Sequence, residues 1–301
     1  DDIVADAMGL RVNRTPLTRS SIYDTTNING FPTVHLAWET RAASRANLFL
    51  VKDGAVFTAL VAYEQTKGFP DLLEGKQIRY HAFPFDEPVR AGLETYRYGA
   101  LGTALAHPMW NSRRVRFVAQ PPDGAVPAIA IFWRSSLGAE GSPSDIVLKV
   151  SRTFAPDDLV AAPELNISTA TPTADMATLL HHTEWDAIED ARAHRAVLRG
   201  NMLALGYTYT WNGPLARYTD LANYDFWIRR SLDGGVTWLA PQNVSNLHGT
   251  TVNVKEPRLV STPKTGTQDD AAFIAAWGTE TSVYGGGAAA PALDLPVRRP
   301  G

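Results

Sequence analysis

The sequence of 301 residues contains no cysteine. Disulfide bonds, thiolate zinc sites and covalent haem attachment are therefore excluded, because each of them needs a cysteine sulfur. The sequence also has no apolar run of about 18 residues or more, so no transmembrane helix is expected. An excess of one charge is lacking too, since 28 Lys+Arg residues stand against 31 Asp+Glu residues, for a net charge of −3. A general nucleic-acid or anionic-membrane surface is therefore not expected.

Common enzyme motifs are missing as well. There is no phosphate-binding loop, no dinucleotide fingerprint and no G-x-S-x-G nucleophile elbow. Potential metal ligands are few: His182 and Asp186 form one i, i+4 pair on a predicted helix, and a solvated helix face is the favoured interpretation. We expect no cofactor. Calcium bound by Asp157–Asp158 or Asp269–Asp270 is an alternative, although polar turns are the commoner role of such pairs.

The most informative stretch that is present is Ser231-Leu-Asp-Gly-Gly-Val-Thr-Trp238. Its Asp-Gly-Gly centre is typical of a hairpin turn, because glycine adopts positive φ easily and aspartate can bond its own backbone. Ser231, Asp233, Gly235 and Trp238 have the spacing of the Asp-box, so the stretch resembles the hairpin signature of sialidase-like (BNR-type) β-propellers. In that family the Asp-box is a folding device remote from the ligand site. The resemblance therefore implies a fold and no activity.

Repeated strand patterns support the same fold. Apolar runs that end in an aromatic and polar residues recur along the chain, at Val34–Glu39, Ala59–Glu64, Ile129–Arg134, Leu203–Thr208 and Phe273–Gly278. A second pattern of a polar residue, alternating apolar residues and a base follows these runs, at Gln77–His81, Asp145–Lys149, Asp225–Arg229 and Asp294–Arg298, with a looser copy at Asn47–Lys52. We interpret each unit as a propeller blade, and the first strand of the second unit as compressed into Gly54–Thr58.

The predicted fold is all-β, a β-propeller of five or six blades that forms a single domain over residues 1–301. A helix-like run from Thr173 to Ala193 lies within an insertion at about 157–193, between blades. A linker-like tail is predicted at about 285–301. Some spacings between repeats are too short for a regular blade, so the chain is interpreted as an abridged version of a longer one, with an irregular propeller as the alternative.

Three strands that begin with arginine give the best candidate ligand site. Arg114, Arg195 and Arg258 come from three predicted blades, and on innermost strands they would converge near the central channel. Three guanidinium groups could hold a carboxylate or phosphate, and sialidases bind the carboxylate of their substrate with such a triad. Ion pairs with neighbouring carboxylates such as Glu39, Glu64 or Glu256 are the favoured alternative. Aromatic residues on long connections could also stack on sugar rings or be buried: Tyr96, Tyr98, Trp110 and Trp211.

Scattered segments also resemble bacterial surface proteins of the choice-of-anchor class, notably Tyr224–Arg230 and Glu256–Val260. That resemblance implies an extracellular, cell-surface or periplasmic protein, with any membrane anchor outside this chain. Asn166-Ile-Ser and Asn243-Val-Ser match the N-glycosylation pattern, which is frequent by chance. The Tyr–Glu nucleophile pair and the acid/base Asp of sialidases are not recognised in the sequence. We therefore expect a non-catalytic binding or scaffold module for a protein partner or glycan, with a sialidase-type glycoside hydrolase as the alternative.

Overall fold

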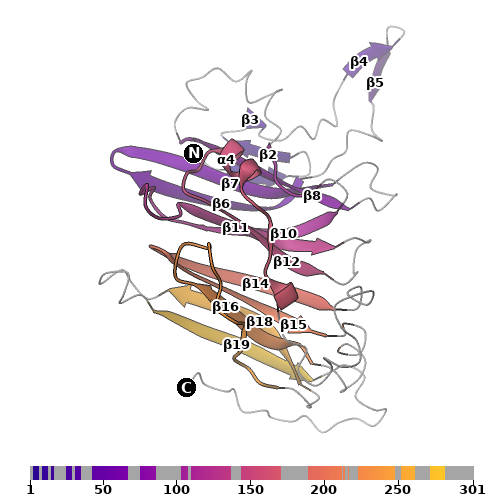
Figure 1. The fold of residues 1–301 in the computed structure, drawn as a ribbon. Helices are drawn as coiled ribbons and strands as arrows, with labels where there is room; N and C mark the ends of the chain where they lie inside the picture. The colour runs from indigo at the N-terminus through magenta and orange to yellow at the C-terminus, as the bar shows by residue number, and fades with distance from the viewer. Residues whose placement is uncertain are drawn as a thin grey trace, which may run out of the picture. The chain divides into compact units, whose positions relative to one another are not determined.

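The computed structural model describes residues 43–66, 75–85, 103–107, 110–136, 144–170, 189–211, 213, 216, 223–247, 252–261 and 272–281. It also gives the backbone of short strands nearer the N-terminus, namely β1 (Ile3–Asp6), β2 (Gly9–Val12), β3 (Thr15–Pro16), β4 (Thr25–Ile28) and β5 (Phe31–Val34). The described part of the chain is all-β with antiparallel sheets, which confirms the predicted class (Figure 1). Helix is confined there to α4 (Pro156–Ala161), the 3-10 turn η2 (Ser168–Ala170) and the single positions 213 and 216. No helix in the described ranges is long and apolar enough to cross a membrane.

After the short N-terminal sheets, four sheets that we number I to IV follow one another in chain order. Sheets I, II and III are meanders of four antiparallel strands, and sheet IV is an antiparallel pair. Sheet I contains β6 (Ala43–Asp53), β7 (Val56–Thr66), β8 (Lys76–Pro84) and β9 (Thr103–Ala104). Sheet II contains β10 (Asn111–Ala119), β11 (Ile129–Ser136), β12 (Asp145–Ser151) and β13 (Leu165–Asn166). Sheet III contains β14 (Asp190–Arg199), β15 (Met202–Thr210), β16 (Asp225–Ser231) and β17 (Gln242–Asn243), and sheet IV contains β18 (Val252–Ser261) and β19 (Phe273–Thr281).

The contacts divide the chain into two compact units. The first comprises residues 1–141 and 149–163, and the second comprises residues 142–148 and 164–301. The second strands of sheets I, II and III are largely buried, whereas β19, the second strand of sheet IV, is half-buried to exposed. All nine residues of β15 are buried, and so are the first five of β11. Such strands are mostly apolar because both of their faces are covered.

The first strand of each of sheets I to IV carries the same irregularity. Each is interrupted by a β-bulge, which adds one residue opposite the second strand and bends the first strand. One residue of each bulge has positive φ although it is not glycine: Arg45, Arg114, Ala193 and Glu256. The register places an aromatic side chain opposite each bulge: Tyr63, Trp133, Tyr207 and Trp277. The aromatic that ends each apolar run in the sequence thus marks one fixed position of the repeat.

The short fourth strand of sheet III is fixed by a polar network that we call the strand-four latch. The buried hydroxyl of Ser245 accepts the backbone N–H of Phe226 at 2.8 Å and donates to Asp225 at 2.6 Å. Oδ1 of Asn243 accepts the backbone N–H of Asn246 at 2.9 Å. The same bonds recur in sheet II with Asp145, Ile146, Asn166, Ser168 and Thr169. Both matches to the glycosylation pattern are therefore equivalent parts of this latch.

Sheet I closes its fourth strand with different residues. The register places Gln77 at the aspartate position and Ala106 at the serine position. Oε1 of Gln77 accepts the N–H of Ile78 at 2.9 Å, and its Nε2 donates to the carbonyl of Ala106 at 3.0 Å. One longer side chain thus replaces the Asp–Ser pair of the other two sheets.

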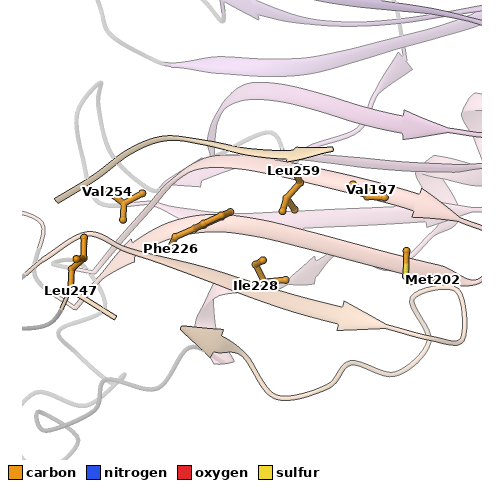
Figure 2. Packing of buried hydrophobic residues seen from close by; sticks show 7 residues of the cluster. All are labelled: Val197, Met202, Phe226, Ile228, Leu247, Val254 and Leu259. Carbon is orange, nitrogen blue, oxygen red and sulfur yellow. The ribbon is translucent and has the colours of Figure 1, made fainter. Parts of the chain in front are cut away.

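The second unit has a core shared by sheets III and IV. Figure 2 shows its seven buried side chains, which come from β14, β15, β16, β18 and the turn after β17: Val197, Met202, Phe226, Ile228, Leu247, Val254 and Leu259. Trp277 of β19 packs against this cluster and meets Phe226 edge to face. Gly206 lies at its centre, where a Cβ atom would approach Phe226 to 2.7 Å and Leu259 to 2.9 Å. The absence of a side chain at Gly206 therefore allows the two sheets to pack closely.

Three details of the sequence interpretation are wrong. Asn47–Lys52 lies in β6, the first strand of sheet I, and is not a copy of a third strand; Gly54 is its hairpin turn and not the start of a compressed strand. The predicted insertion at 157–193 ends too late, because Asp190–Ala193 belong to β14, where Asp190 pairs with Thr210. The helix predicted from Thr173 to Ala193 is wrong over its last four residues, which lie in β14, and its part up to residue 188 lies outside the described residues. The last apolar–basic repeat at 294–298 and the tail at 285–301 also lie outside them.

Candidate functional site

The turn at Ser231–Trp238 has a dense hydrogen-bond pattern. The hydroxyl of Ser231 donates to Asp233 at 2.8 Å and accepts the N–H of Gly235 at 2.7 Å. Asp233 accepts both the N–H and the hydroxyl of Thr237, and the indole of Trp238 donates to the carbonyl of Gly235. Gly235 has a φ of 91°, which explains the need for glycine there. All these bonds stay within the turn, which gives it a structural role.

The three arginines proposed for an anion clamp differ in their local surroundings. Arg114 is the positive-φ residue of its bulge, and its backbone N–H donates to the buried carboxylate of Glu64 at 2.7 Å. Arg195 donates from Nη1 to the carbonyl of His194 at 2.7 Å. Arg258 is half exposed and lies 3.4 Å from the carboxylate of Glu256 on the same strand.

The strand register shows that these three arginines do not all occupy the same position of the repeat, although the sequence had predicted that they do. Arg195 and Arg258 are the first paired residues after their bulges, and the corresponding residue of β10 is Arg116. Arg114 corresponds instead to Ala193 and Glu256, the bulged positions. The bulge inserts a residue that a regular two-residue alternation does not count. The convergence of the arginines stays a prediction.

A repeated contact near the start of the first strands leads to a stronger candidate. In the first unit, Oδ1 of Asn111 accepts the backbone N–H of Lys76 at 2.9 Å. In the second unit, Oδ1 of Asn253 accepts the backbone N–H of Tyr224 at 2.7 Å. The register places Asp190 at the same position of β14. The repeat therefore has a carboxylate in sheet III where sheets II and IV have a carboxamide.

Asp190 is buried, with 1% of its surface exposed, and has several polar neighbours. The hydroxyl of Ser144 donates to Oδ1 at 2.9 Å, and the hydroxyl of Tyr224 donates to Oδ2 at 2.6 Å. Arg192 forms an ion pair with Oδ2, and its guanidinium lies over the Tyr224 ring, 5.2 Å from the centroid. Gly213 packs closely enough that a Cβ atom there would lie 3.1 Å from Cβ of Asp190. Asp190 is thus the centre of a compact polar cluster.

More carboxylates lie beside this cluster. Burial raises the pKa of Tyr209 far above its ordinary value, and the neighbouring carboxylates of Glu189 and Asp145 raise it further. Tyr209 therefore remains a neutral phenol at physiological pH. We define the tyrosine–carboxylate cluster as Ser144, Asp145, Glu189, Asp190, Arg192, Tyr209 and Tyr224. It combines carboxylates with hydroxyl donors in a largely buried setting, an arrangement suited to proton transfer.

The weak metal candidates His182 and Asp186 lie outside the described residues, as does the pair Asp269–Asp270. Asp157 and Asp158 lie in the first turn of α4, where Asp158 accepts the hydroxyl of Thr153. Among the residues that the structure describes, no group of three or more potential ligands could hold a metal ion.

Sequence reasoning missed the tyrosine–carboxylate cluster. A signal for it exists in the pattern [ND]-x-[RK]-x-x-R, which occurs at Asn111–Arg116, Asp190–Arg195 and Asn253–Arg258. When the three segments are aligned on this pattern, Asp190 stands at the first position, where the other two segments have asparagine.

Comparisons with known proteins give one structural likeness. No protein-family model matches the chain, and no curated protein matches it. The chain is similar to the solved structure of a mutant α-L-arabinofuranosidase from Fusarium graminearum in complex with an iminosugar inhibitor. The sequence identity is 12% and the TM-score is 0.38 over 79% of this chain, which spans 62% of the length of that enzyme. Because that protein is a glycoside hydrolase, the predicted non-catalytic binding or scaffold module is corrected and is not retained.

Proposed function

We propose that the protein is a glycoside hydrolase whose active site is the tyrosine–carboxylate cluster of the second unit. The observation that carries this proposal is the set of contacts of Asp190 with Ser144, Tyr224 and Arg192, which brings the segments that hold Glu189 and Asp145 together. Glycoside hydrolases commonly need two carboxyl groups beside the scissile bond, one to transfer a proton and one to stabilise or attack the positively charged sugar. Of these two groups, Glu189 is buried and Asp145 is partly buried.

We assign different roles to the two carboxyl groups. Glu189 has no acidic counterpart at the equivalent positions of β10 and β18, which are Trp110 and Val252. We assign it the proton transfer to the leaving oxygen. Asp145 already holds Ser168 in the strand-four latch, so its position is fixed. We assign it the stabilisation of positive charge on the sugar ring in the transition state.

This proposal is tested with a panel of para-nitrophenyl and methylumbelliferyl glycosides that includes the α-L-arabinofuranoside and the sialoside. We expect turnover of at least one glycoside, and Glu189→Gln should lower kcat/KM by at least about 100-fold, the usual contribution of a positioned acid. Glu280→Gln is the matched control, because Glu280 is an exposed residue on β19 whose carboxylate meets Lys255. Circular dichroism checks that both variants fold. Equal activity of the Glu189 variant and the wild type would refute the assignment.

We further propose that the four sheets are blades of a β-propeller. The support is their common meander order, the bulge in each first strand and the aromatic residue opposite it. An electron-microscopy map of the protein should show a disc with radially arranged sheets, and an open stack of sheets would contradict the proposal. The extracellular or periplasmic location rests on family resemblance alone, and fractionation of the cells that make the protein tests it.

A further inference from the structure

Exposed apolar side chains of the second unit gather at one end of its sheets. In the described part of this unit, the large apolar residues that are exposed are Leu232, Val236, Leu239, Val260 and Ile274. The first three lie in the turn between β16 and β17, and the other two form a pair where β18 ends and β19 begins. In an antiparallel meander the connections after the first and the third strand leave the sheet at the same end. The bond between Arg199 and Ser261 joins the corresponding ends of β14 and β18, so all five side chains lie at one end of sheets III and IV.

The tyrosine–carboxylate cluster lies at the opposite end of sheet III. Asp190 pairs with Thr210 where β14 begins, whereas Ser231 pairs with Leu203 where β16 ends. The strand β16 has seven residues. At the usual rise of a strand, this length separates its two ends by roughly 20 Å. A surface that covers the Ser231–Trp238 turn therefore does not reach the cluster.

The apolar residues of the Ser231–Trp238 turn are not needed for its fold. Its hydrogen bonds come from its polar residues and from the indole of Trp238. Leu232 and Val236 are 61% and 76% exposed, so they bury little apolar surface within the protein. Leu239, just after the turn, is 45% exposed. We call these three side chains the turn patch, and a contiguous exposed apolar patch of this kind marks an interaction surface.

The turn can leave water at little cost, because many of its polar groups already have partners. The backbone N–H groups that donate within the protein are those of Gly234, Gly235, Thr237 and Leu239. Asp233 is the only carboxylate between residues 229 and 242, and it accepts hydrogen bonds from Ser231 and Thr237. An unsatisfied polar group is costly in an apolar medium, and these groups do not carry that cost.

Arginines surround the base of the turn. Arg229 and Arg230 precede it at the end of β16, and the guanidinium of Arg229 lies over the Trp238 ring, 5.7 Å from the centroid. Arg199 ends the neighbouring strand β14. At this end of sheet III the three arginines stand against the single carboxylate of Asp233, so the local charge is positive although the net charge of the chain is −3.

From these features we propose that the turn patch inserts into the surface of an anionic lipid bilayer, with the three arginines at the level of the headgroups. Aliphatic side chains backed by arginine and tryptophan are typical of segments that lie in a membrane interface. Anionic headgroups attract basic residues that come close to them. A protein partner fits less well, because leucine and valine are under-represented among the residues that dominate protein interfaces. The proposal does not depend on hydrolase activity.

Flotation of the full chain with lipid vesicles tests the proposal. The wild type should float with vesicles of equal parts phosphatidylcholine and phosphatidylserine, and less with phosphatidylcholine alone. The double variant Leu232→Ser with Val236→Ser should bind the mixed vesicles about 10-fold more weakly or worse, because two apolar side chains no longer enter the lipid. Arg230→Gln should weaken binding to the mixed vesicles by about 5-fold and leave binding to phosphatidylcholine unchanged.

Two controls match these variants. The double variant Leu232→Met with Val236→Ile keeps an apolar turn patch and should float as the wild type does. Lys255→Gln removes an exposed positive charge near the start of β18, at the other end of the sheets, and should have no effect on flotation. Circular dichroism checks that every variant folds.

Three results would overturn the lipid proposal. One is the absence of flotation with the mixed vesicles, and another is equal flotation of the wild type and the serine double variant. The third comes from sedimentation without lipid: a dimeric wild type and a monomeric serine variant would make the turn patch an interface between two copies of the chain. Turnover of glycosides in solution should be the same in the wild type and the serine variant, so failure of the hydrolase proposal and failure of the lipid proposal are seen separately.

Discussion

The carboxylate of Asp233 is exposed, yet several donors surround it. Thr237 contributes its hydroxyl and its backbone N–H, and Ser231 contributes its hydroxyl. These bonds, first of all the one from the Thr237 side chain, lower the pKa of Asp233 to about 2 from an ordinary value of 3.8. The folded turn therefore binds the charged form of Asp233 better than the unfolded chain does.

This shift predicts a pH dependence of stability. Because the pKa is lower in the folded state, the contribution of Asp233 is fully present above the unfolded value of 3.8. It is lost as the pH falls through 3.8 toward the folded value of about 2. We expect the stability difference between the wild type and Asp233→Asn to be constant from pH 7 to about pH 5 and to shrink below pH 4. Urea unfolding at a series of pH values measures this difference, and a difference that does not change down to pH 2 would refute the role of Asp233.

At the scale of single strands, the strand-four latch connects sequence to architecture. Ser245 and Ser168 are buried, and each serves both a backbone N–H and a carboxylate. The fourth strands β13 and β17 have only two residues each, too few to be held by ladder bonds alone. Side-chain bonds therefore fix the end of these sheets.

Removal of a latch hydroxyl should destabilise the protein measurably. Ser245→Ala leaves the buried N–H of Phe226 and the carboxylate of Asp225 without this partner, so we expect a loss of about 1–3 kcal/mol. Ser261→Ala is the control, because its hydroxyl lies 3.4 Å from Arg199 and is only half-buried. The control should stay within about 0.5 kcal/mol of the wild type. Chemical denaturation measures both, and equal stabilities would show that the latch contributes nothing.

Strand positions were largely predictable from the sequence, whereas the register was not. The apolar runs at 59–64, 129–134 and 203–208 lie on second strands because burial of both faces demands apolar residues there. The run at 273–278 also lies on a second strand, β19, but its residues alternate between half-buried and exposed. The bulges could not be predicted, since their positive-φ residues are Arg, Ala and Glu and not glycine. Because the extra residue of each bulge cannot be seen in the sequence, Arg114 was predicted to be equivalent to Arg195, whereas the structure makes Arg116 its equivalent.

The site was less predictable than the fold, for a physical reason. Glu189 and Asp190 are adjacent in sequence, but Ser144, Tyr209 and Tyr224 reach them only through the packing of β12, β14, β15 and β16. A local sequence pattern cannot show that residues from different strands come into contact. The exceptional Asp190 becomes visible only when the first strands are aligned through their bulges.

At the scale of the whole molecule, β12 links the two compact units. Residues 145–148 of this strand belong to the second unit, and residues 149–151 belong to the first. If one half of β12 unfolded, the strand would fray at the boundary, and the other half would lose part of its backbone hydrogen bonds. We therefore expect the units to lose structure together.

Calorimetry tests this expectation on the full chain. Differential scanning calorimetry should show one transition, with a van't Hoff enthalpy close to the calorimetric enthalpy. Ser245→Ala should shift this whole transition and not split it, although its latch lies in the second unit. Two resolved transitions, or a shift of only part of the heat absorption, would show that the units unfold independently.

The two forms of the strand-four latch also constrain how this chain can change over evolutionary time. In sheet I, Gln77 needs only the carbonyl of Ala106, whereas in sheet III Asp225 needs the hydroxyl of Ser245. A Gln77→Asp change alone would bury a carboxylate opposite a methyl group, and an Asp225→Gln change alone would crowd the serine. Each single step is unfavourable while the double change is accommodated, so the two positions must be inherited as a pair. Sheets of this protein can therefore be recombined as whole units, but not residue by residue.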